Sequence, residues 1–238
     1  DGERDIAAGQ AFEKLRKDTH AIESFEPPRD WQLFGSFDWG SSRPFCLCMW
    51  TVADGNALPD GRMYPRGAMI RYNEWYGWNG KPNEGARMEV GEVAQGIDDR
   101  YRDRKPSYIA ADPSMWKVDG GPSHAETFLK HGVVLRRADN SRLTGYLAVR
   151  DRIAGNEDGP MLYATKNCHD GFWRTMPDVV MDEHHPEDVD TSQEDHPYDD
   201  VRYACMSRPW VRLSEPKDRN KRRDYDFNEQ EEESWRTA

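Results

Sequence analysis

Three aspartates in this sequence stand where a strand is expected to end or a helix to begin. Asp38 closes the apolar stretch at residues 31–40, WQLFGSFDWG, which is typical of a strand bound for a protein core. Asp112 follows a second short apolar stretch, and Asp199 lies near the start of a helix expected at 198–207. A carboxylate at the tip of a buried strand is costly unless a cation holds it. We therefore hypothesise that Asp38 is the first ligand of a catalytic metal site.

Each of these aspartates also has an ordinary structural explanation. Asp38 can cap the turn that follows it at 40–42, and Asp112 stands before a proline, where an aspartate caps a turn or a helix. Asp199 and its neighbour Asp200 are first-turn acids, which the helix dipole stabilises. No single aspartate decides between structure and chemistry, so the question is whether the fold brings all of them together.

The expected elements explain how acids far apart in the sequence can meet. A hairpin run of three strands comes first, and helices then alternate with shorter strands up to a final helix. That order matches the ribonuclease-H-like fold, an α/β fold whose mixed central sheet is flanked by helices. Neighbouring parallel strands end at the same edge of a sheet, where ligands bind. Strands are expected at 31–38, 45–52, 67–75, 107–111, 133–136 and 161–164, and helices at 6–15, 90–104, 123–131, 141–153, 167–176 and 198–207.

Size and composition agree with one large domain that carries polar appendages. The 238 residues are 36% hydrophobic and 32% charged. The net charge of −11 argues against a simple nucleic-acid coat protein, but not against an enzyme that handles nucleic acid through metal ions. No apolar run approaches about 18 residues, so no membrane span is expected. We expect a lead-in or linker at 1–30, a ribonuclease-H-like domain at 31–210 and a disordered charged tail at 211–238.

Several common functional motifs are absent. No G-x-x-x-x-G-K-[ST] sequence is present, so the chain encodes no P-loop ATPase, and no G-x-G-x-x-G, G-x-S-x-G or H-E-x-x-H sequence occurs. The four cysteines form no CxxC pair, which is typical of buried, reduced thiols in a cytosolic protein.

Four segments carry a family resemblance. They are GSFDWGSSRPF (35–45), ADPSMW followed by DGGPS (111–116 and 119–123), ADNSRLTGYLAVRDRI (138–153) and PEDVDTSQEDHPYDDVRYA (186–204). Together they resemble the C-terminal nuclease domain of the large terminase subunit of tailed bacteriophages, over roughly residues 31–208. The last segment is the most specific, because an acid-histidine-x-x-aspartate followed by Arg-Tyr rarely arises by chance.

The resemblance implies a site and a reaction. In that family three aspartates bind two divalent ions, Mg²⁺ or Mn²⁺, and they correspond to Asp38, Asp112 and Asp199. Asp200 stands where a small residue is commoner, so the third ligand is either Asp199 or Asp200. The implied activity is endonucleolytic cutting of double-stranded, concatemeric viral DNA during genome packaging, in the cytoplasm of the infected host. The implied partners are the terminase ATPase domain, which this chain lacks, the small terminase subunit and the portal.

His196 falls where some members of that family place a histidine ligand. It precedes Asp199 by three positions, and residues at that separation are neighbours at a helix start. Pro197 is expected to hold His196 extended, just outside the first turn, with its imidazole facing the same ion as Asp199. The alternative is that His196 caps the helix or lies in the acidic loop. An imidazole ligand would favour Mn²⁺ over Mg²⁺.

Two other functions remain open at this point. One is another ribonuclease-H-like nuclease such as a junction resolvase, and the other is a non-catalytic module that docks on DNA or on the portal. For DNA contacts, basic residues in the second half of the chain are candidates, although each one alone is equally well explained as an ordinary surface residue. The candidates are Arg142, Arg150, Arg152 and Lys166.

Overall fold

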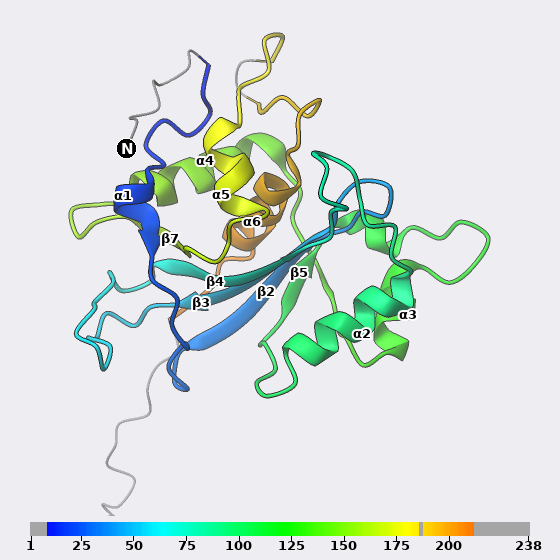
Figure 1. Cartoon of the computed structure of the whole chain (residues 1–238), viewed down its shortest axis with the longest axis horizontal. Coiled ribbons are helices and arrows are strands. Elements are labelled where there is room, and N and C mark those ends of the chain that lie inside the picture. Colours follow the sequence, from blue (N-terminus) through cyan, green and yellow to red (C-terminus); the bar gives the residue numbers. More distant parts are fainter. Residues whose placement is uncertain (1–8, 186–187, 212–238) are drawn as a thin grey trace, which may run out of the picture.

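The computed structural model describes residues 9–185 and 188–211. Its centre is one seven-stranded mixed sheet in the order β1-β7-β4-β3-β2-β5-β6, with helices on both faces (Figure 1). The expected mixed α/β architecture is therefore confirmed. The strands are β1 (Ala21–Ile22), β2 (Gln32–Asp38), β3 (Cys46–Val52), β4 (Met69–Tyr76), β5 (Ile109–Ala111), β6 (Arg136–Arg137) and β7 (Leu162–Thr165).

The helices form two layers around the sheet. The helices α4, α5 and α6 cover one face, and α2 and α3 cover the other (Figure 1). A short helix, α1, precedes β1, and no helix of the described residues combines the length and the apolar character that a membrane span requires. The bounds are α1 (Lys17–His20), α2 (Val90–Arg100), α3 (His124–Lys130), α4 (Arg142–Ala154), α5 (Phe172–Thr175) and α6 (His196–Met206).

The hairpin strands β2 and β3 contribute to two hydrophobic cores, one on each face of the sheet. Every residue of β2 and β3 is buried, and these strands pair antiparallel with Asp38 opposite Cys46. Successive side chains of a strand point to opposite faces. Phe34 therefore packs with α4, α5 and α6, whereas Phe37 packs with α2 and α3. Asp38 shares the face of Phe34, so its carboxylate emerges on the side that α6 covers.

Three expected elements differ in the structure, and one of them, the helix expected at 167–176, is reduced to α5 (Phe172–Thr175). The strand expected at 133–136 is shorter and begins later, because the N–H of Val133 still bonds to the carbonyl of Phe128 in the turn that ends α3. In the helix expected at 6–15, the described residues 9–15 form turns instead. There Gln10 bridges Val180 and Ala11 donates to Val179, so tertiary pairing overrides the helical pattern.

Part of the stretch expected as a linker packs with the sheet. Ala11, Phe12 and Leu15 are buried in the core under α4 and α6, and β1 adds a strand beside β7. Residues 1–8 and the expected charged tail, apart from Val211, lie outside the described residues. The domain boundaries therefore stay a prediction.

Candidate metal centre

Asp38, Asp112 and Asp199 line one hollow of about 440 Å³. Asp38 and Asp112 stand at the carboxyl ends of the neighbouring parallel strands β2 and β5, where the N–H of Asp112 donates to the carbonyl of Phe37 at 2.9 Å. Asp199 reaches the same place from the first turn of α6, which packs across β2. The strand order and the position of α6 thus bring together the acids that the sequence singled out.

Asp112 is a cap and a hollow-lining residue at the same time. It is the N-cap of the 3₁₀ helix η1 (Pro113–Trp116), where its Oδ1 accepts the N–H of Ser114 at 2.9 Å and its Oδ2 accepts the Ser114 hydroxyl. These bonds fix the orientation of the carboxylate. The structural explanation considered for Asp112 and its place in the hollow therefore do not exclude each other.

Asp199 is held by a buried arginine that sequence reasoning missed. Arg202, one turn later on α6, donates from Nε and Nη2 to a single oxygen of Asp199, Oδ1, at 3.1 and 2.7 Å. Arg202 is only 2% exposed, and its Nη1 has no hydrogen-bond partner among the described residues. It also lines the hollow. Arg202 therefore brings a cation to the edge of the acid cluster and orients the Asp199 carboxylate.

A glycine in α4 makes room for this arginine. A Cβ on Gly145 would lie 2.4 Å from Cγ and 2.5 Å from Cδ of Arg202. The Arg202 side chain has little freedom to retreat, because it is buried and its guanidinium lies 4.9 Å from the centroid of the Tyr203 ring. Only glycine lets α4 and α6 approach this closely, and this offsets its poor helix propensity.

We expect Gly145→Ala to destabilise the protein although alanine is the better helix former. Overpacking against Arg202 should lower the free energy of unfolding by about 1–3 kcal/mol, measured by urea titration. The matched control is Gly91→Ala in α2, where the nearest atom to an added Cβ is the flexible end of His131, at 3.2 Å. The control should be neutral or slightly stabilising. A Gly145→Ala protein as stable as wild type would contradict this account of the α4–α6 contact.

Asp195 is a second residue of the hollow that sequence reasoning did not select. It is the N-cap residue of α6, is 8% exposed and lines the hollow beside Asp199. The signal for it was its spacing, four residues before Asp199 at the end of the acidic run. It raises to four the number of aspartates around the hollow.

His196 lies at the hollow, but not in the expected conformation. It is the first residue of α6 rather than an extended residue outside the helix, because Asp195 takes the N-cap position and Pro197 falls inside the first turn. Its Nδ1 faces Oδ2 of Asp38 at 3.2 Å, and its Nε2 faces Oδ1 of Asn83 at 3.0 Å. The imidazole therefore links Asp38 to the loop that follows β4.

The electrostatics of the hollow favour divalent cations. Burial raises the pKa of Asp38 well above its usual range, and the charges of Asp199 and Asp112 raise it further. Burial and the charge of Asp199 raise the pKa of Asp195 to about 6. A bound cation would relieve this repulsion, and carboxylate oxygens are the donors that Mg²⁺ and Mn²⁺ prefer. The donor set therefore fits hard divalent ions.

Solved structures of phage large terminases share this architecture. No protein-family model and no curated protein matches the chain. The P22 large terminase nuclease domain aligns over 88% of this chain and 97% of its own, with a TM-score of 0.63 and 15% identity. The large terminase nuclease of thermophilic phage G20c with bound cobalt aligns over 84% and 97%, with a TM-score of 0.54 and 12% identity. This chain has the fold of a large-terminase nuclease domain.

The large terminase of another thermophilic bacteriophage has a TM-score of 0.65 and 18% identity to this chain. The alignment covers 85% of this chain but 46% of that terminase, so the chain spans about half of that length. Likeness at these identities establishes the ribonuclease-H-like terminase nuclease fold, and the activity must be argued from the site.

Within this terminase nuclease fold, Asp199 and Asp200 have different surroundings. Asp199 lines the hollow, whereas Asp200 is fully buried between α6 and the sheet, where its Oδ2 lies 3.4 Å from Nη1 of Arg71. Burial raises the pKa of Asp200 to about 7, although the Arg71 charge opposes this. The position of Asp200 therefore does not support the ligand role considered for it, and Asp199 is the acid that faces the hollow.

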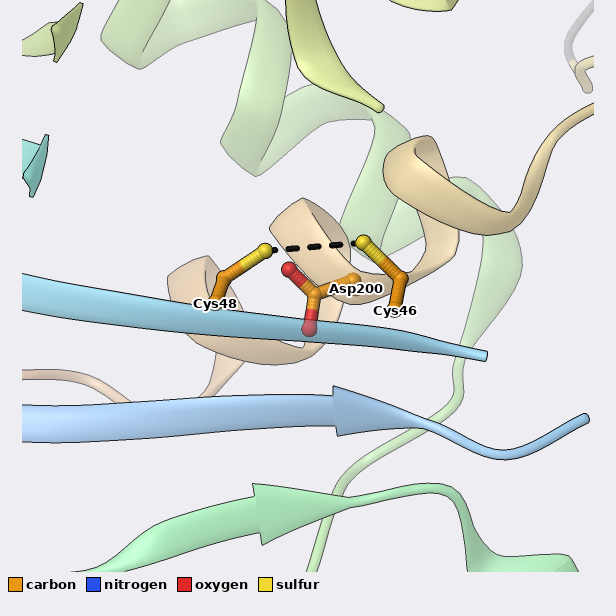
Figure 2. Close-up of side chains that lie close together, drawn as sticks. All are labelled: Cys46, Cys48 and Asp200. Carbon is orange, nitrogen blue, oxygen red and sulfur yellow. Dashed lines mark hydrogen bonds between the residues drawn. The ribbon is translucent and has the colours of Figure 1, made fainter. Parts of the chain in front are cut away.

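Asp200 belongs to a separate buried cluster (Figure 2). Its carboxylate and the thiols of Cys46 and Cys48 lie within 4.8 Å of one another, a spacing that a metal ion can use. The Arg71 guanidinium already lies against this group, since its Nη2 is 3.4 Å from Sγ of Cys46. Burial raises the pKa of both thiols, which keeps them neutral. The cluster is thus a buried ion pair with two thiols rather than a second metal site.

The four basic candidates do not gather at the hollow. Arg142 lines it, but its guanidinium pairs with Asp188. The other three lie elsewhere and are engaged locally, each by a different group. Arg150 pairs with Asp151, Arg152 donates to the carbonyl of Gly67, and Lys166, which follows β7, pairs with Glu23.

Proposed function

We propose that this chain is a metal-dependent endonuclease that cuts double-stranded, concatemeric viral DNA during genome packaging. The observation that carries the proposal is that four aspartates line one hollow at the edge of the sheet where β2 and β5 end. They are Asp38, Asp112, Asp195 and Asp199. Phosphodiester hydrolysis of the two-metal type needs several carboxylates around two ions roughly 3.5–4 Å apart. The cobalt named for the G20c nuclease supports metal use by this fold.

The residues of the hollow have separate roles in this proposal. Asp38, Asp112 and Asp199 would hold two divalent ions, Mg²⁺ or Mn²⁺, and Asp195 stands close enough to add a fourth carboxylate. When bound, such ions polarise a phosphate and lower the pKa of water. Arg202 donates two hydrogen bonds to Oδ1 of Asp199, and these bonds fix the orientation of the whole carboxylate. Oδ2 takes no part in them. His196, whose Nδ1 lies 3.2 Å from Oδ2 of Asp38, would add an imidazole ligand.

The biological setting follows from the same proposal. This chain would act together with a terminase ATPase domain, as it spans about half of the large terminase described above. The small terminase subunit and the portal are the further partners proposed, with double-stranded DNA as substrate and the host cytoplasm as the place of action.

A plasmid-cutting assay tests the proposal directly. Supercoiled DNA incubated with the purified chain and Mn²⁺ should become nicked and then linear, and EDTA should stop the reaction. Linear duplex should be cut at least as well as a four-way junction, since a strong preference for the junction would favour a resolvase. Absence of cutting with either substrate and with several divalent ions would favour a non-catalytic docking module.

His196 should influence which metal supports cutting. We predict that the wild-type chain cuts faster with Mn²⁺ than with Mg²⁺, because an imidazole ligand favours Mn²⁺ and later transition metals. His196→Ala should then lose more of its Mn²⁺ activity than of its Mg²⁺ activity, measured as initial nicking rates at saturating metal. Equal losses with both ions would instead assign His196 to holding Asp38 through its 3.2 Å contact, and not to the metal.

A further inference from the structure

An apolar cleft of about 320 Å³ lies between α2, the loop that leads into β5 and the segment that leads into β6. Ile97, Ile109 and Val133 line it, and each of these side chains is at most 5% exposed. The cleft stands where β5 and β6 begin, whereas Asp112 follows the other end of β5. No residue that lines this cleft also lines the hollow of the aspartates, so the two are separate features.

Exposed hydrophobic side chains continue the cleft toward α3. Val134 is 69% exposed, and it lines both this cleft and a second one of about 130 Å³. Leu129, which is 59% exposed, and Trp116 also line the second cleft. We call the two clefts, joined at Val134 and Leu135, the apolar groove. Exposed apolar side chains gathered beside a concave surface are typical of a site that binds another segment of protein.

Two exposed arginines of the edge strand β6 stand at this groove. Successive side chains of a strand point to opposite faces, so each arginine contacts a different part of it. Arg136 lines the first cleft with its guanidinium 4.9 Å from the ring centroid of Tyr108, and Arg137 lies 5.4 Å from that of Trp116 in the second cleft. Neither arginine has a carboxylate within ion-pair distance in the described part of the chain.

The acids that line the apolar groove are already engaged. Asp98 pairs with Lys105, and the carboxylate of Glu126 accepts the N–H and the hydroxyl of Ser123. The charge left without a partner at the groove is therefore positive. Its chemistry fits a segment that offers apolar side chains together with carboxylates.

This chain contains a segment of that kind. Residues 224–235, DYDFNEQEEESW, lie outside the described residues and contain six acids, three aromatic residues and no lysine or arginine. In an extended segment, residues two positions apart face the same side. Tyr225 and Phe227 therefore share one side of such a segment, and Asp224 and Asp226 share the other.

The described part of the chain ends beside the groove. The ring of Trp210 stacks on Tyr108, with ring centroids 5.8 Å apart, and Tyr108 lines the first cleft. The N–H of Trp210 donates to Oε1 of Gln32 at 3.1 Å, which fixes this exit point. The twelve residues at 212–223 span up to about 40 Å when extended, so the acidic segment can reach the groove.

We propose that the apolar groove binds residues 224–235 of this same chain. Tyr225 and Phe227 enter the groove, and the acids of the segment pair with Arg136 and Arg137. The short connection gives the segment an effective concentration of about 1 mM, so modest contacts hold it. Disorder expected for the charged tail agrees with this, because such a segment orders where it binds. The proposal goes beyond the nuclease function and does not depend on it.

Disulfide trapping in the full chain tests the proposal. Val134→Cys combined with Phe227→Cys should close a disulfide within the chain in oxidised glutathione, measured by mobility on non-reducing gels and by intact mass. The four native cysteines are buried and should not compete. The matched control joins Phe227→Cys to Met63→Cys, because Met63 is 68% exposed in the loop whose Gly67 lies near Val211. Tethering alone favours this control at least as much, whereas docking should make the groove pair close at least about tenfold faster.

Charge supplies the second measurement. Raising the salt from about 50 mM to about 0.5 M should slow closure of the groove pair several-fold and leave the control pair unchanged. Arg136→Glu with Arg137→Glu should slow it likewise, whereas Arg150→Glu should not. Equal rates for the groove and control pairs, or a groove rate that ignores both salt and the arginine substitutions, would overturn the proposal. Disulfide-linked dimers in place of a closed chain would also overturn it, because the occupant would then come from a second copy. None of these readouts requires DNA cutting, so failure of the nuclease proposal leaves this test intact.

Discussion

Asp38→Asn, Asp112→Asn and Asp199→Asn should each abolish detectable cleavage. Each substitution removes one negative charge from the hollow, keeps the shape of the side chain and weakens the binding of both ions. Loss of one electrostatic partner at a reacting centre costs at least about a hundredfold in rate, and a shared site should lose more. Initial nicking rates with Mn²⁺ measure this effect, and titration calorimetry of Mn²⁺ should show weaker binding by the same variants.

Stability separates this loss from misfolding. Asp38 is buried among like charges, so Asp38→Asn should raise the melting temperature in EDTA. The matched control is Asp119→Asn, an exposed aspartate that follows η1 and should leave cutting unchanged. If any of the three variants cuts at close to the wild-type rate, that residue is not a metal ligand.

The hydrophobic patterns of the sequence predicted the two strands and the helix that position the aspartates of the site. The apolar runs that end at Asp38 and Asp112 became the parallel neighbours β2 and β5, and the helix that carries Asp199 crosses them. Strand ends can be predicted because burial imposes a local hydrophobic pattern. The meeting of these acids followed from topology, since parallel strands share an edge.

The burial of the contacts that complete the site depends on tertiary structure. Arg202 follows Asp199 by three residues on α6, a spacing that the sequence does show, but its burial against Gly145 of α4 follows from the packing of the two helices. Lys166 lies away from the hollow because β7 joins the sheet beyond β4, on the far side from β5, and strand order cannot be read from a single sequence.

Arg71→Met should be the most destabilising of the substitutions considered. Arg71 lies with its side chain fully buried, 2.6 Å from Glu74 and 3.4 Å from Asp200, and these acids would be left buried without a cation. Breaking a buried pair in this way costs about 3–5 kcal/mol. For a domain of this size that corresponds to a fall in melting temperature of about 6–20 °C, measured by calorimetry in EDTA.

A double variant identifies the cause of that loss. Arg71→Met combined with Asp200→Asn should recover part of the stability, because the charge nearest the lost guanidinium is then removed, while Glu74 keeps the N–H groups of Gly171 and Phe172. Arg150→Met breaks an exposed pair with Asp151 and should change stability by less than about 1 kcal/mol. No recovery in the double variant would mean that Arg71 stabilises the core through its packing on the Phe172 and Trp50 rings rather than through its charge. Recovery would mean instead that the unpaired charge of Asp200 causes the loss, and that the Arg71 guanidinium stabilises α6, the helix that carries Asp199, by pairing with this buried acid.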